Sequence, residues 1–378
     1  MLGLSARHAR WAAPVVIAAA VAGGAQVAAQ ASTARPDLPQ LTARDLLVKV
    51  QTAKVSALSG TVRSTTDLGV PALPQRGGLD WSSLLTGTQT LRVYLDGPQR
   101  QRVDLVGTLT QASVVHDDST LWTWNSTTRT VTRTALPPSG GARAPQALPD
   151  VPGSSNHLAT RMPLTPQQAA EQALAAVSPT TKVSVGRSAS VAGRDAYDLR
   201  LQPKDTASLV GSVDVYVDAR TGLVLRTVVT PRSGGAAAVD IGFTRLSLTA
   251  PAASTFRFSP PPGSSVRDVP LPTKPHAGPT ATDQPSVQTF GTGWTTVVRT
   301  TAPSATTSPT PSAGSQESAD PLAGVLLRAS TPVPADRLPG GGRLLTTRLV
   351  SVLLTHDGHL YVGAVTPDQL IRTARANG

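Results

Sequence analysis

Apolar and polar residues alternate along residues 191–263, which form the most regular stretch of the chain. A period of two places alternate side chains on opposite faces of a strand. The stretch therefore predicts antiparallel strands with one buried face and one solvated face. The apolar positions are Tyr197, Leu199, Leu201, Val213, Val215 and Val217. No catalytic motif interrupts them, so the functional question is what lies against the apolar face.

The same alternation predicts a meander of further strands between residues 59 and 134. Two neighbouring strands carry apolar residues of one parity, which predicts one apolar face. These residues are Leu91, Val93, Leu95, Val103 and Leu105. Trp122 and Trp124 share a parity on a later strand, and Trp81 lies in a Gly/Pro-rich excursion. We interpret the three tryptophans as one apolar surface, which is either the wall of a ligand cavity or ordinary core.

Two helices are predicted to pack on the sheet. The first runs from about Thr42 to Ala57, because Thr42 and Asp45 form a capping box and apolar residues follow at helical spacing. The second begins at Thr165, with Pro166 at its first position. Core packing and a lid over a ligand predict the same helical pattern, so the sequence leaves both open.

The N-terminus has the order of a secretory signal. Arg7 and Arg10 precede a charge-free apolar run from Trp11, and small residues follow it up to about residue 31. We therefore expect an exported protein of the cell envelope or extracytoplasmic space. An uncleaved membrane anchor is the alternative, since the run is just long enough to span a bilayer.

Composition shifts beyond Gly263, where proline, serine and threonine accumulate. We expect a strand from Val287 to Arg299 inside this linker region, a helix over 322–328, a long strand from Arg343 to Thr355, a hairpin turn at Asp357, and a last helix from Thr366. The predicted domains are a signal or anchor at 1–31, a main domain at 37–270, a linker region at 271–320 and a small α+β module at 321–378.

Few residues are suited to catalysis or metal binding. The chain has no cysteine, and His356 and His359 flank a hairpin turn with no third ligand near them in sequence. Glu171 and Glu317 are its two glutamates, and the aspartates lie mostly in turns or on solvated strand faces. We therefore expect no enzyme activity, no cofactor and no metal.

The formal net charge is +11, and nearly all of the positive charge is arginine. The arginines are scattered over the polar strand faces rather than clustered, which is not typical of nucleic-acid binding. For an exported chain, anionic lipid headgroups or wall polymers are the partners that we expect this charge to attract.

Three motifs resemble the LolA-like proteins, and most closely their actinobacterial outer-membrane-lipoprotein-sorting homologues. They are the Gly-x-x-x-Tyr-x-Leu of Gly193, Tyr197 and Leu199, the Val-Asp-x-x-Thr-Gly-Leu of residues 217–223, and the Phe-x-Phe-x-Pro-Pro-Pro-Gly of residues 256–263. The resemblance covers about residues 41–263, and residues 344–375 also resemble the tail of such homologues. The Ala/Arg-rich composition agrees with an actinobacterial source.

The resemblance implies a mainly β chain with helices (α+β), built as a curved, incompletely closed antiparallel β-barrel with helices on its concave side. It also implies a carrier that binds the acyl chains of lipids or lipoproteins between sheet and helices. The expected ligand-binding residues are Leu47, Val50, Trp81, Leu91, Val93, Leu105, Trp122, Trp124, Val213 and Val215. The alternative is a regulator of the same fold, whose C-terminal module binds a membrane anti-sigma factor.

Overall fold

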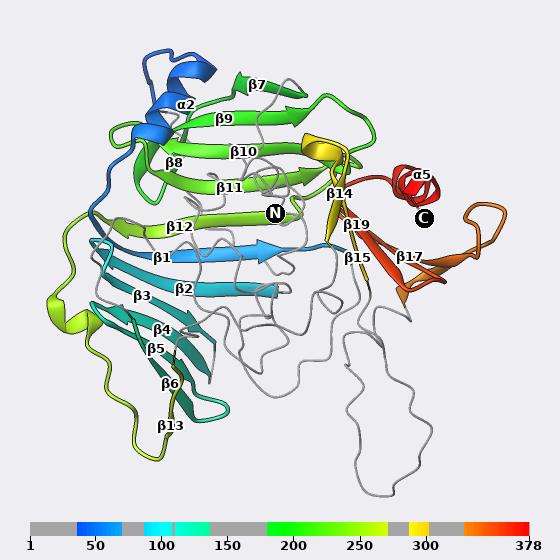
Figure 1. The fold of residues 1–378 in the computed structure, drawn as a ribbon. Coiled ribbons are helices and arrows are strands. Elements are labelled where there is room, and N and C mark those ends of the chain that lie inside the picture. Colours follow the sequence, from blue (N-terminus) through cyan, green and yellow to red (C-terminus); the bar gives the residue numbers. More distant parts are fainter. Residues whose placement is uncertain are drawn as a thin grey trace, which may run out of the picture.

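The computed structural model describes residues 36–69, 87–107, 110–136, 180–270, 287–301 and 329–377. These residues form two sheets, one of thirteen strands and one of six (Figure 1). No helix in the described ranges is both long enough and apolar enough to cross a bilayer. The signal segment, the helix expected from Thr165 and the helix expected over 322–328 lie outside the described residues.

The larger sheet is antiparallel except at one edge, where β13 pairs parallel with β6. Its strands are β1 (Ala57–Thr66), β2 (Gly87–Asp96), β3 (Arg100–Val106), β4 (Gln111–Asp117), β5 (Thr120–Asn125), β6 (Thr130–Ala135), β7 (Thr181–Val185), β8 (Ala189–Val191), β9 (Arg194–Pro203), β10 (Val210–Asp218), β11 (Val224–Pro231), β12 (Val239–Ser247) and β13 (Ser265–Asp268). Their order is β13-β6-β5-β4-β3-β2-β1-β12-β11-β10-β9-β7, and β8 also pairs with β9.

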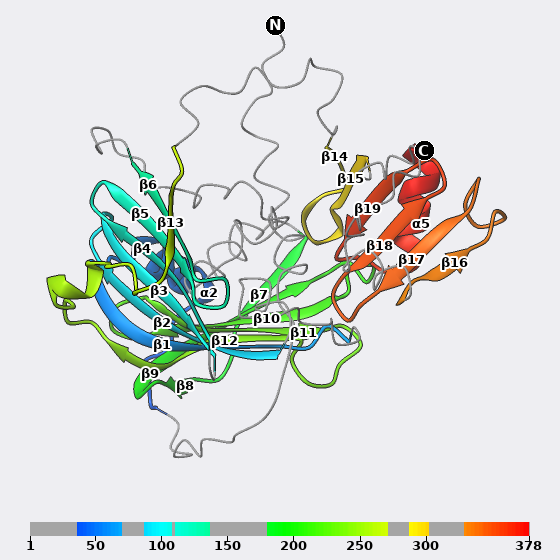
Figure 2. The same ribbon diagram turned by 90° about the horizontal axis from the view of Figure 1, so that it is seen from below.

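This sheet curves strongly but does not close, because β13 and β7 remain as its two ends (Figure 2). Long twisted sheets curl in this way, and a bulge at Thr61 and Val62 between β1 and β12 adds to the twist in the middle. The expected fold class, a mainly β chain with a curved and incompletely closed antiparallel sheet, is confirmed.

Helix α2 (Ala43–Thr52) lies on the concave side of this sheet, against β7 and β9 (Figure 2). Its capping box is present as predicted, with Asp45 N–H donating to Thr42 Oγ1 at 3.2 Å. The helix ends five residues before the predicted Ala57. The prediction was wrong there because Ala57 already begins β1, opposite Asp96 of β2, and Ala53 has an extended backbone.

Two of the motifs position α2. Tyr197 Oη donates to the carbonyl of Pro39 at 3.0 Å, which fixes the segment leading into the helix. At the β10–β11 turn, Asp218 accepts two hydrogen bonds from Arg194 and two from Thr221. Gly222, which follows Thr221 in this turn, has φ +76, and a Cβ there would lie 2.5 Å from the carbonyl oxygen of Lys49. The turn therefore contacts the end of α2 backbone to backbone.

The smaller sheet has the order β14-β15-β19-β18-β17-β16. Its strands are β14 (Gln288–Phe290), β15 (Val297–Thr301), β16 (Thr331–Val333), β17 (Gly342–Thr346), β18 (Ser351–Thr355) and β19 (His359–Gly363). Helix α5 (Pro367–Asn377) begins where the Thr366-Pro367 signal predicted, and it packs on β18 and β19 through Leu370, Ile371 and Ala374.

Two predicted strands of this part are each divided. The strand expected from Val287 is β14 and β15, separated by the short 3₁₀ turn η4 (Gly293–Thr295), and both strands belong to the smaller sheet. The strand expected from Arg343 to Thr355 is the hairpin β17–β18. It divides because Thr347 N–H donates to the carbonyl of Val350 at 2.8 Å and so closes a turn.

The β17–β18 turn fastens the smaller sheet to the larger one. Arg348 Nη1 donates to the carbonyl and, at 2.7 Å, to the carboxylate of Asp67, and Nη2 donates to the carbonyl of Ala236. Leu349 and Val350 are buried in the core of the larger sheet. A β-bridge between Ser208 and Val365 makes a second junction.

A third junction involves a buried tryptophan. Trp294 Nε1 donates to Thr181 Oγ1 of β7 at 2.7 Å, and Trp294 belongs to the core of the larger sheet. The smaller sheet is therefore packed against the larger one, rather than being joined to it by a linker alone.

We predict that Gly222→Ala destabilises the protein by about 2 kcal/mol more than Gly234→Ala. Both glycines have a left-handed φ, but a Cβ at Gly234 meets nothing within 4 Å, whereas one at Gly222 meets the α2 backbone. Urea unfolding of both variants measures the difference. Equal destabilisation would show that the contact with α2 contributes nothing beyond the backbone strain.

Arg348→Ala is expected to lower the free energy of unfolding by about 2 kcal/mol, because it leaves the carbonyl of Ala236 and the carboxylate of Asp67 without their donor. It should also speed proteolysis between the two sheets. The matched control is Arg337→Ala, which removes an exposed ion pair between the β16–β17 connection and Asp368 of α5 and should change stability by less than about 0.5 kcal/mol. Limited proteolysis followed by mass spectrometry locates the cuts, and equal behaviour of the two variants contradicts the prediction.

Candidate functional site

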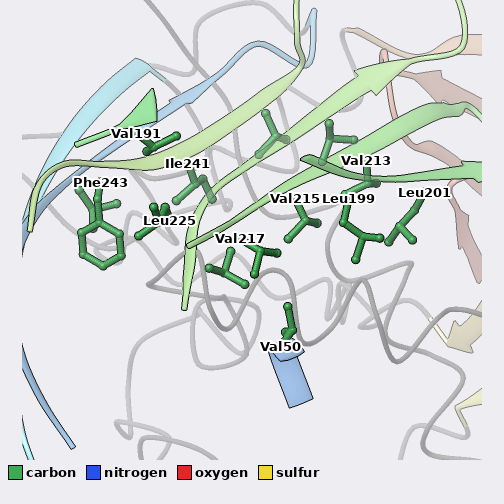
Figure 3. Packing of buried hydrophobic residues seen from close by; sticks show 14 of the residues in the cluster. Val50, Val191, Leu199, Leu201, Val213, Val215, Val217, Leu225, Ile241 and Phe243 are labelled. Carbon is green, nitrogen blue, oxygen red and sulfur yellow. The ribbon is translucent and has the colours of Figure 1, made fainter. Parts of the chain in front are cut away.

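The concave face of the larger sheet, which we define as the face that bears α2, is lined by aliphatic side chains. Directly paired residues share a face, so Leu199 and Leu201 of β9 lie beside Val215 and Val213 of β10. Figure 3 shows Val50 of α2 directed toward the valines and leucines of these strands. Leu46 and Val50 supply the buried stripe of the helix.

The aliphatic lining continues across the middle of the sheet. Val62 of β1 lies between Phe243 of β12 and Leu91 of β2, and Leu91 is paired with Leu105 of β3. These side chains belong to one buried cluster with the residues of β9 to β11. The concave face is therefore mostly apolar from β3 to β9, with the buried hydroxyl groups of Ser64, Thr66 and Thr227 among its aliphatic side chains.

Most of the residues predicted to bind a ligand lie on this surface. Val50, Leu91, Val93, Leu105, Val213 and Val215 are each at most 3% exposed. Leu47 is partly buried and packs against the same cluster. Trp81 lies outside the described residues. The six buried residues meet in one cluster although β2 and β10 are separated by three strands of the sheet.

Trp122 and Trp124 require a correction, because they lie on the opposite, convex face. Trp124 is paired with Ser113 of β4, and Ser113 is paired with Asp104 of β3. Asp104 precedes Leu105, whose side chain lies on the concave face, so Asp104, Ser113 and Trp124 lie on the convex face. The tryptophans instead lie near the short 3₁₀ turn η3 (Ala253–Phe256) and the residues after it. Phe258 is 5.5 Å from Trp122 between ring centroids, and the Arg133 guanidinium lies 5.6 Å over the Trp122 ring.

Several residues of the concave surface were not among the predicted binding residues. Leu46 of α2 is fully buried between the helix and the sheet. Its position in the apolar stripe of the helix was the signal that could have identified it. The others come from the regular alternation of β9, β11 and β12. They are Leu199, Leu201, Leu225, Val229, Ile241 and Phe243.

The convex face has the opposite chemistry. On β9 and β10, Arg200 donates to Asp214, and Asp198 lies directly opposite Tyr216. Asp198 is 4% exposed, its Oδ1 has no hydrogen-bond partner, and a Cβ on Gly186 would clash with its other oxygen. Burial, together with the charge of Asp214, raises the pKa of Asp198 to about 6 despite the opposing charge of Arg200.

The described residues offer little else for chemistry. No three His, Asp or Glu side chains among them gather as a metal site would require. What the arrangement can do is hold apolar groups out of water on its concave side. The contacts available there are mostly van der Waals contacts with aliphatic side chains. The buried Oγ1 of Thr66, which has no hydrogen-bond partner, lies on the same face.

The pH dependence of stability should report on Asp198. Its pKa is raised in the folded state, so the folded protein holds a proton between about pH 4 and 6 that the unfolded chain has already released. Stability is therefore expected to fall as the pH rises through this window. Asp198→Asn should remove that fall and raise the free energy of unfolding at pH 7.5 by roughly 2 kcal/mol.

Urea unfolding at several pH values measures both effects. The control is Asp240→Asn, which removes the partner of Arg226 on the same face and should not stabilise the protein at pH 7.5. An Asp198→Asn protein with the same pH profile as the native one contradicts the prediction.

No protein-family model matches the chain. No curated protein sequence matches it either. Among solved structures, MucB of Pseudomonas aeruginosa in its complex with MucA has 17% identity and a TM-score of 0.42, over 88% of this chain and 96% of that one. A LolA-superfamily protein of Nitrosomonas europaea has 12% identity and a TM-score of 0.20, over 58% of this chain and 99% of that one. A putative outer-membrane lipoprotein-sorting domain of Vibrio parahaemolyticus has 11% identity and a TM-score of 0.23, over 54% of this chain and 92% of that one. LolA-superfamily proteins are therefore among the structures similar to this chain.

Proposed function

We propose that this chain is an exported carrier or sensor that binds the acyl chains of lipids or lipoproteins between the concave face and α2. The observation that carries the proposal is the largely aliphatic surface from β3 to β9, with α2 lying on one end of it. An acyl chain needs no polar partner, so a surface dominated by valine and leucine side chains suits it.

In the described conformation the side chains of this surface are nearly inaccessible, and Leu46 and Val50 of α2 pack on its end at β7 and β9. An acyl chain that binds between this end and α2 requires the helix to move away from β9. The helix is attached at its two ends, by the Pro39–Tyr197 hydrogen bond and by the contact of Gly222 with Lys49. Its middle is attached by aliphatic contacts, which an acyl chain can replace with contacts of the same kind.

The energetics allow such an exchange. Burial of one methylene group contributes roughly 0.8 kcal/mol, so a chain of about 16 carbons gains on the order of 12 kcal/mol before ordering costs. That gain exceeds the loss expected from moving two aliphatic side chains of α2 off the sheet, at about 1.5–3 kcal/mol each. A bound acyl chain therefore stabilises the open position of the helix.

We also propose that the chain is a LolA-like protein of actinobacterial type. The motifs that carry this resemblance are used in the fold to hold α2, through Tyr197 and the turn of residues 217–223.

A regulator that binds a membrane anti-sigma factor is the second candidate. It is favoured by the face of the smaller sheet that points away from α5, where Val298, Leu354 and Leu360 are only partly buried. Elsewhere on this face, Val352 and Val362 pack against the core of the larger sheet. One of the similar structures is MucB in complex with MucA, and this chain would use its smaller sheet for a comparable contact. The interaction would need no opening of α2.

Acyl binding is tested by native mass spectrometry and by titration with a fluorescent fatty acid. We expect the native protein to bind the probe and Leu47→Asp to bind it at least tenfold more weakly, because a carboxylate then faces the acyl chain. Val48→Asp is the matched control, since Val48 is 50% exposed on the same helix, and its affinity should stay within twofold. Circular dichroism checks that both variants are folded.

A native protein that binds no acyl probe and carries no lipid from its own host would overturn the carrier proposal. The regulator proposal is tested separately, by pull-down from the host membrane with Leu354→Glu and Leu360→Glu. Truncation of the smaller sheet is unsuitable, because it would also remove Trp294, Leu349 and Val350 from the main core. Capture of a membrane anti-sigma protein that both substitutions abolish would favour the regulator.

A further inference from the structure

Three exposed arginines lie together in the middle of the convex face. Arg92 of β2 and Arg245 of β12 are both paired with Thr61 of β1, one from each side. Arg63 follows two residues along β1 and therefore has the same orientation as Thr61. Strand spacing places Arg92 and Arg245 about 10 Å apart with Arg63 beside them. We name Arg63, Arg92 and Arg245 the convex arginine cluster.

These three arginines differ from the other arginines of the same face. Arg102, Arg200 and Arg226 each form an ion pair with an aspartate of their own or a neighbouring strand. Within the described ranges, no carboxylate lies within ion-pair distance of any member of the cluster. The carboxylate nearest in register is Asp104, directly opposite Arg92, and it is paired with Arg102. The like charges of the cluster on adjacent strands repel one another.

The side chains of Arg63, Arg92 and Arg245 are all exposed. Strands β12, β1 and β2 lie in the middle of the strand order, with their convex side facing away from α2 (Figure 2). On this side β8 contacts β12. The turn η3 packs on the convex face farther along, at β3 and β4. The side chains that share the cluster's face on β1 and β2 include the hydroxyls of Ser59, Thr61 and Thr90.

We propose that the convex arginine cluster docks the protein onto a bilayer surface rich in anionic lipids. Guanidinium groups bind phosphate oxygens with two parallel hydrogen bonds, and the neighbouring hydroxyls can donate further ones. The cluster lies on central strands of the sheet, and its three side chains are exposed, so a lipid surface can contact them on the convex side. The docked protein turns its concave face away from the bilayer.

Trp122 and Trp124 are not part of this surface, although they belong to the same face of the sheet. They lie on β5, and the curvature turns that strand's convex side away from the direction in which β1 faces (Figure 2). The docking is therefore electrostatic, and it should weaken steeply with salt.

The test uses the full chain with sedimented vesicles of phosphatidylcholine alone or with about 30% phosphatidylglycerol. We expect binding only to the anionic vesicles. The triple variant R63Q/R92Q/R245Q should bind at least tenfold more weakly, since each arginine near an anionic surface contributes about fivefold in affinity. The matched control R187Q/R372Q/R375Q removes three exposed arginines elsewhere and the same charge, and it should bind within twofold of the native protein.

Three results would overturn the proposal. Equal weakening of both triple variants would show attraction by net charge alone, without a site. Native-like binding of R63Q/R92Q/R245Q would place the membrane contact elsewhere in the chain. Displacement from the vesicles by soluble polyphosphate at an equal concentration of phosphate groups would mean that the cluster binds polyanions in general. Because acyl binding is measured with a separate probe, its outcome does not affect this test.

Discussion

Burial of the concave face of a strongly curved sheet is the constraint on which the rest of this structure depends. Alternation leaves a row of aliphatic side chains on one side of each of the central strands, and such a surface has to be covered in water. The described structure covers part of it with α2. Trp294, Leu349 and Val350 of the C-terminal part belong to the same buried cluster. The smaller sheet is thereby tied to the core of the larger one.

The two faces of the larger sheet divide the chemistry of the protein. The concave face offers mostly aliphatic contacts, which suits a flexible apolar ligand, with a few buried hydroxyl groups such as that of Thr66. The convex face holds charged groups, most of which are paired, such as Arg226 with Asp240. Asp198 departs from this pattern, since its pKa of about 6 reflects a carboxyl group buried without a full set of hydrogen bonds. A residue of that kind lowers stability at neutral pH, and nothing in the concave surface requires it.

The motifs that resemble a known family are structural in this chain. Tyr197 and Gly222 fix the two ends of α2, and Asp218 closes the turn that brings Gly222 to the helix. Phe256 of the third motif is fully buried where η3 packs on β3 and β4. An apolar ligand surface leaves no motif of its own, because many combinations of Val, Leu and Ile satisfy it. The motifs therefore mark how the covering elements are attached and leave the ligand unspecified.

The sequence by itself determined most strands of the larger sheet, the alternation of side chains between the two faces of each strand, the capping box of α2 and the start of α5, because these depend on spacing within a few residues. It also placed Leu91, Leu105 and Val215 in one apolar set. The tertiary structure decided which face each hairpin presents, and so it placed Trp122 and Trp124 on the convex side. It also decided that residues 343–355 fold back as β17 and β18, since Arg348 in their turn binds Asp67 of the larger sheet. Register and contact between distant segments set these features, and a local period of two carries no information about either.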